Sequence, residues 1–117
     1  MSNSKQYDLE DRTLQYSKKV IELCRELPVG DINRRLKDQL LRSATSIGAN
    51  YREVNETDTK KDFKNRIRIA KKEAKETVYW LELLLELNSQ FDYKIRLLLK
   101  ETNEFVKILA AIYFKIK

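Results

Sequence analysis

The chain has 117 residues, a length that fits one domain with a single hydrophobic core. It carries 24 Lys and Arg against 18 Asp and Glu, a formal net charge of +6, and has one cysteine and no histidine. This composition cannot supply the usual zinc or iron ligand sets, and it lacks the commonest general base, so we expect no metal, no cofactor and no enzyme activity.

The first apolar pattern predicts a helix over about residues 9–27, because its apolar side chains recur at spacings of three and four. The stretch "PVGD" then breaks the helix, and Asp31 is expected to be the N-cap of a second helix over about residues 31–54. Its apolar stripe is Ile32, Leu36, Leu40, Ala44, Ile47, Tyr51 and Val54.

A third helix is predicted after the loop "NETD", with Asp58 or Thr59 as its cap, and it continues to Asn88. After "NSQFD" a fourth helix follows over about residues 95–116. Because the composition includes only two glycines and one proline, few turns are available and long helices are favoured. Three short connections between four helices predict an all-α, antiparallel up-down-up-down four-helix bundle that forms one domain over residues 1–117.

The N-terminal stretch "MSNSKQYDLEDRT" is polar, and no apolar run approaches the roughly 18 residues of a membrane span. We therefore expect a cytoplasmic protein that is not membrane-bound. Cys24 lies among Val20, Ile21 and Leu27, which predicts a buried thiol rather than a nucleophile.

The third predicted helix has an unusual charge distribution. Residues 60–75 hold eight basic side chains and two acidic ones, and six of the basic ones fall within about a quarter turn of the helix circumference. The basic residues come early in this helix, which opposes the helix dipole because the dipole favours cations at the C-terminus. Some of them also stand four residues apart, where like charges repel each other. Two interpretations remain open, a solvated helix face or a surface for an anionic partner. The stripe consists of Lys61, Lys64, Arg68, Lys71, Lys72 and Lys75.

Apolar side chains also lie outside the core stripe of the third helix, and apolar surface that one core does not use often marks a protein interface. We expect a homo-oligomer, with a wide core as the alternative. The predicted interface residues are Ile69, Trp80, Leu83 and Leu87.

The second helix carries a polar edge beside small residues. Gly48 within a helix indicates close approach by another helix, because glycine there costs about 1 kcal/mol relative to alanine. The polar edge, Gln39, Ser43, Ser46 and Asn50, predicts tight packing with side-chain hydrogen bonds, and a polar ligand groove is the alternative.

The stretches "QLLRSATSIGANYREV" and "KDFKNRIRIAKKEAKETVYWLELLLEL" resemble the four-helix-bundle family named for proteins encoded in intervening sequences of 23S rRNA genes. That family includes accessory variability proteins of diversity-generating retroelements. The resemblance implies a cytoplasmic ring of five subunits and, for the retroelement members, a basic surface that engages a reverse transcriptase and nucleic acid. The matching motif residues are Gln39, Arg42, Ser43, Ser46, Gly48, Asn50, Arg52, Glu73, Glu76, Tyr79 and Trp80.

The sequence therefore predicts a non-enzymatic protein that associates with RNA or DNA through the phosphates, using the basic stripe. Weak specificity is expected, because no aromatic residues suited to base stacking are interleaved with the lysines of the third helix. The alternative is a protein-binding accessory subunit, such as a partner of a reverse transcriptase.

Overall fold

The computed structural model describes the backbone of residues 2–116 and the side chains of residues 9–116. Within that range, the predicted bundle of four helices is confirmed, and no strand occurs. No helix in the range is both long and apolar enough to cross a lipid bilayer. The helices are α1 (Ser2–Glu26), α2 (Asp31–Glu53), α3 (Lys60–Leu87) and α4 (Asp92–Lys115), with 3₁₀ turns η1 (Val54–Glu56) and η2 (Ser89–Phe91) in two of the connections.

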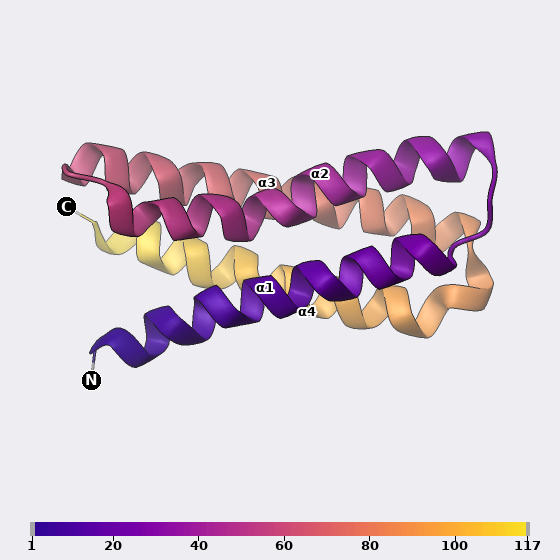
Figure 1. Ribbon diagram of the computed structural model, residues 1–117, viewed down its shortest axis with the longest axis horizontal. Coiled ribbons are helices and arrows are strands. Elements are labelled where there is room, and N and C mark those ends of the chain that lie inside the picture. Colours follow the sequence, from indigo (N-terminus) through magenta and orange to yellow (C-terminus); the bar gives the residue numbers. More distant parts are fainter. Residues whose placement is uncertain (1, 117) are drawn as a thin grey trace.

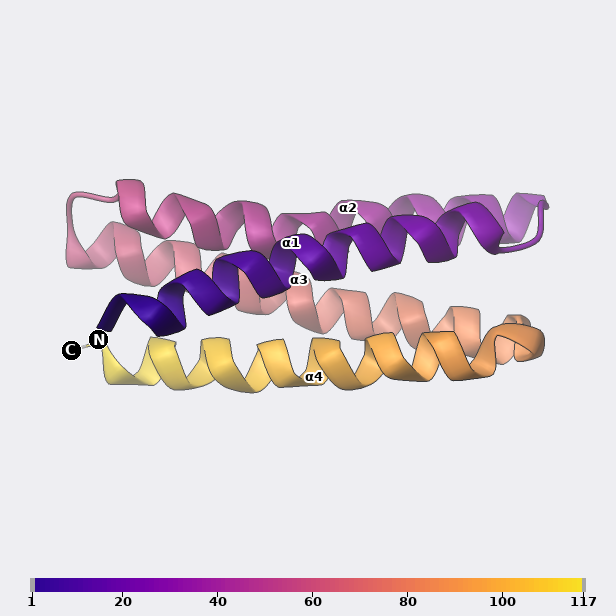
Figure 2. The same cartoon turned by 60° about the horizontal axis from the view of Figure 1, so that its bottom comes forward.

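Successive helices run in opposite directions, and both chain ends lie at the end of the bundle that holds the α2–α3 connection (Figure 1). α3 packs against both α2 and α4 along much of its length, whereas α1 packs mainly on α2 and more briefly on α4. α1 crosses the bundle obliquely, as the turned view shows (Figure 2). Within the described range α1 does not pack on α3, so the outer face of α3 is left uncovered by the first helix.

One core runs the length of the bundle and is built from the predicted stripes. Tyr16 of α1 meets Phe105 of α4 edge-on, with ring centroids 5.1 Å apart, and both side chains are fully buried. Ile32 is an exception to the predicted stripe of α2, because 65% of it is exposed. It lies in the first turn of α2, beyond the reach of the core.

The helix boundaries differ from prediction at two N-termini. α1 begins at Ser2 rather than near Leu9, since its first turns carry no periodic apolar stripe that a sequence pattern could detect. Asp31 is the first residue of α2 and not its N-cap, which is Gly30 with a φ of 153° that strongly favours glycine. Thr59 is confirmed as the cap of α3, because its side-chain oxygen accepts a hydrogen bond from the Asp62 N–H at 3.0 Å.

The thiol of Cys24 is buried, as predicted, with 8% of the residue exposed. Burial raises the pKa of Cys24 to about 11, because the charged thiolate would lose its hydration. The thiol is therefore protonated near neutral pH, which fits a packing role.

Gly48 marks a close approach of α1 to α2. A Cβ placed on Gly48 would lie 2.9 Å from Thr13 Oγ1 and 3.0 Å from Thr13 Cβ. Thr13 is buried, and its hydroxyl donates a hydrogen bond to the Glu10 carbonyl oxygen at 3.0 Å, so it has little room to move. The predicted close approach is confirmed, and α1 is the helix that makes it.

Replacing Gly48 with alanine should therefore destabilise the bundle even though alanine is the better helix former. Overpacking typically costs about 1 to 3 kcal/mol, which exceeds the gain of up to about 1 kcal/mol in helix propensity. Urea denaturation of Gly48→Ala should show a lower free energy of unfolding. The cost should shrink in a Thr13→Ala background, and a stabilised Gly48→Ala protein would contradict the packing described here.

Candidate nucleic-acid interface

The predicted basic stripe follows the outer face of α3, opposite the side that packs into the core. Lys61, Arg68, Lys72 and Lys75 are exposed, whereas Lys64 and Lys71 are partly buried. The buried face of the same helix is formed by Ile67, Ala70, Ala74, Thr77, Leu81 and Leu84. Because one helix carries both faces, core packing fixes the direction in which the cations point.

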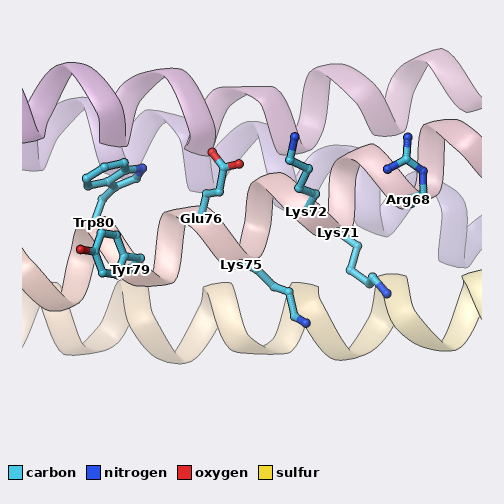
Figure 3. Close-up of a pocket in the computed structure, with 7 residues that line it drawn as sticks. All are labelled: Arg68, Lys71, Lys72, Lys75, Glu76, Tyr79 and Trp80. Carbon is cyan, nitrogen blue, oxygen red and sulfur yellow. The ribbon is translucent and has the colours of Figure 1, made fainter.

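Four of the six cations line an open groove of about 440 Å³ on this face. Figure 3 shows Arg68 at one end and Tyr79 and Trp80 at the other, with Lys72 and Glu76 on the side of α2 and Lys71 and Lys75 on the side of α4. Lys61 and Lys64 do not line the groove. Only part of the predicted stripe thus lines the groove, and the aromatic side chains of Tyr79 and Trp80 form one end of it.

Lys64 and Lys71 contact aromatic rings of α4. The Nζ of Lys64 lies 4.7 Å from the centroid of the Tyr113 ring, and the Nζ of Lys71 lies 5.1 Å from the same centroid. Lys71 also lies 5.6 Å from the ring centroid of Phe114, which is 74% exposed. These cation–π contacts hold two lysines against the bundle. Sequence analysis missed the two α4 aromatics, although the end of an antiparallel α4 necessarily lies beside the start of α3.

Glu76 is the one acidic residue that lines the groove, and its charge is already paired. Arg42 of α2 donates hydrogen bonds to Glu76 Oε1 at 2.8 Å and to Glu73 Oε1 at 3.2 Å. Hydrogen bonding to Glu76 raises the pKa of Arg42, and the nearby charge of Glu73 raises it further. Among residues 9–116, no ion pair involves Arg68, Lys71, Lys72 or Lys75. Positive charge therefore dominates the groove.

Three motif residues of α2, Arg42, Ser43 and Asn50, form polar contacts with α3. Thr77 Oγ1 donates to Ser43 Oγ at 2.8 Å in the buried interior, and Arg66 donates to Asn50 Oδ1 at 3.0 Å. Ser46 donates to the Arg42 carbonyl oxygen at 2.7 Å, within α2. Gln39 and Arg52 are exposed. The prediction of side-chain hydrogen bonds that fix the helix register is supported at Ser43 and Asn50.

The four predicted interface residues differ in exposure. Leu87 is 54% exposed, whereas Ile69 and Leu83 are partly buried. Trp80 is also partly buried and packs against the core cluster rather than projecting away from it. Its indole N–H is enclosed and has no hydrogen-bond acceptor among the described residues, so ring packing alone holds Trp80 in place.

Acidic and thiol side chains do not gather elsewhere in a way that suggests a metal centre. Within the described part of the chain, no three Asp, Glu or Cys residues come close enough together to hold an ion.

Comparisons with known proteins agree with this architecture. Residues 5–111 match the family model described as 23S rRNA-intervening sequence protein. A crystal structure from Bacteroides thetaiotaomicron, described as a protein of unknown function from the S23 ribosomal protein family, is 34% identical to this chain. The alignment covers 89% of this chain and 96% of that one, with a TM-score of 0.78. No curated protein matches. The chain belongs to the family of 23S rRNA-intervening sequence proteins.

Removing the Arg42 side chain should weaken the contact between α2 and α3. The Glu73 side chain is only 13% exposed. Without Arg42 its carboxylate would lose its charged partner, and little water could replace that contact. We expect Arg42→Ala to lower the free energy of unfolding by about 1 kcal/mol, a modest value because Arg42 itself is half exposed. Arg35→Ala, at an exposed position on the same helix, is the matched control. Equal effects of the two changes in thermal or urea denaturation would contradict a stabilising role for the Arg42 pairs.

Proposed function

We propose that this protein is a non-enzymatic nucleic-acid-associating protein that binds phosphate groups in the basic groove of α3. The observation that carries the proposal is the groove itself, in which three of the four lining cations are exposed and the single lining carboxylate is held by Arg42. A phosphate backbone offers the complementary charge in a regular array. The absence of histidine supports a binding role rather than a catalytic one.

The placement of the cations supports the same proposal. Lys64, Arg68 and Lys72 follow one another at intervals of four residues, so they repel each other along one side of α3. Bound phosphates would relieve this repulsion, which the stability of the core otherwise has to offset.

We further propose that the chain assembles into a homopentamer, as the family resemblance implies. Leu87 and its partly buried neighbour Leu83 supply apolar surface on α3 beyond the groove. A ring would repeat the groove five times and so strengthen binding to a long polyanion by multivalency. A role as the accessory subunit of a reverse transcriptase stays a prediction from the resemblance.

The triple change Arg68→Gln, Lys72→Gln and Lys75→Gln should weaken binding to a labelled nucleic acid. Each lost phosphate contact should reduce the slope of log affinity against log salt by about 1 or slightly less. These three side chains are exposed and glutamine is a comparable helix former, so the helix content measured by circular dichroism should stay the same. Fluorescence anisotropy at several salt concentrations provides both the affinity and the slope.

The matched control changes Lys18, Lys19 and Arg25 of α1 to glutamine. It removes the same charge from exposed positions on a helix that does not pack on α3. The proposal requires the α1 control to bind nearly as the parent does. Equal weakening by both triple variants would mean that net charge alone governs binding, and unchanged binding by the α3 variant would leave the groove as a solvated face.

The assembly has its own test. Light scattering should give a mass of about 70 kDa, five times the 14.0 kDa of one chain. Leu87→Gln should lower this mass if the exposed leucine lies at the subunit contact, and its surface position should spare the fold. A monomer at micromolar concentration would contradict the assembly. If Leu87→Gln still forms a pentamer, the ring stands but Leu87 does not lie at its subunit contact.

A further inference from the structure

Tyr79 presents a largely uncovered aromatic ring at one end of the basic groove (Figure 3). The residue is 56% exposed, and its ring meets Trp80 edge-on with centroids 5.1 Å apart and an interplanar angle of 67°. Trp80 packs against the core, so this contact supports the Tyr79 ring while much of the ring remains open to solvent. An exposed ring held on a rigid helix is a surface on which a nucleobase can stack.

Three exposed cations lie in line with this ring along the helix. Lys75 and Lys72 precede Tyr79 by four and seven residues, which places them about one and two turns away, roughly 6 and 10 Å along the axis. Arg68 lies one further turn along. The face therefore offers a stacking surface followed by a row of positive charges. Proteins that bind single-stranded nucleic acid combine these two features.

We propose that the groove prefers unpaired nucleotides, with a base stacked on Tyr79 and the adjoining phosphates against Lys75, Lys72 and Arg68. A base inside a duplex is covered on both faces by its neighbours, so it cannot use the tyrosine without being unstacked. This inference rests on the proposed function and adds a preference for strand state. Tyr79 is not interleaved with the lysines but lies beyond Lys75, at the end of their row.

Three ligands of equal length separate the contributions of base and phosphate. They are oligo(dT), a DNA duplex, and an abasic strand that keeps the phosphates and lacks the bases. The parent protein should bind oligo(dT) more tightly than the other two. Tyr79→Ala should weaken oligo(dT) binding by about tenfold, the loss typical of one stacked base, and leave the duplex and abasic affinities unchanged.

Two variants control for the loss of a tyrosine. Tyr79→Phe keeps the ring and should retain the parent's affinity for oligo(dT). Tyr93→Ala removes a 75% exposed tyrosine from α4, outside the groove, and should change nothing. Trp80 is the single tryptophan of the chain, so its fluorescence should change when a base stacks beside it and should change less with the abasic strand.

The possible failures are distinguishable. Equal affinity for single strand and duplex, with Tyr79→Ala binding as the parent does, would overturn the stacking inference and leave phosphate binding intact. An absence of binding to all three ligands would overturn the proposed function and the inference together. An altered assembly mass for Tyr79→Ala, with unchanged oligo(dT) affinity, would assign Tyr79 to a contact between copies and also overturn the inference.

Discussion

The packing of α3 between α2 and α4 is the constraint on which the other features depend. Ala70, Ala74 and Thr77 are fully buried in the middle of α3, and such small side chains allow two neighbouring helices to approach the same segment. Because this face of α3 is buried, the opposite face points out of the bundle. The direction of the cations therefore follows from core packing, and the stability of the core compensates for the repulsion among them.

The contact between α2 and α3 also determines the charge of the groove. Arg42 reaches across to Glu73 and Glu76, and so the acid that lines the groove, Glu76, is held by a cation of the neighbouring helix. The buried hydrogen bond between Ser43 and Thr77 fixes the register that makes this pairing possible. Arg42, one of the motif residues, thus affects the charge of a neighbouring surface.

Most of the fold could be predicted from the sequence, because apolar spacing and the scarcity of glycine and proline leave few alternatives to long helices. The early start of α1 escaped prediction, since its first turns lack an apolar stripe. At the site, the helical period predicted the outward direction of Arg68, Lys72 and Lys75. The rings of Tyr113 and Phe114 beneath Lys71 belong to a helix about forty residues away in sequence, and only tertiary packing brings them together.

The central claim is that the outer face of α3, and not the general positive charge of the protein, receives the nucleic acid. Lysine acetylation with and without oligo(dT), read residue by residue by mass spectrometry, tests this claim most directly. We expect Lys72 and Lys75 to become protected, while Lys18 and Lys19 of α1, which are also exposed, react as they do in the free protein. Equal protection of all four lysines, or protection confined to α1, would contradict it.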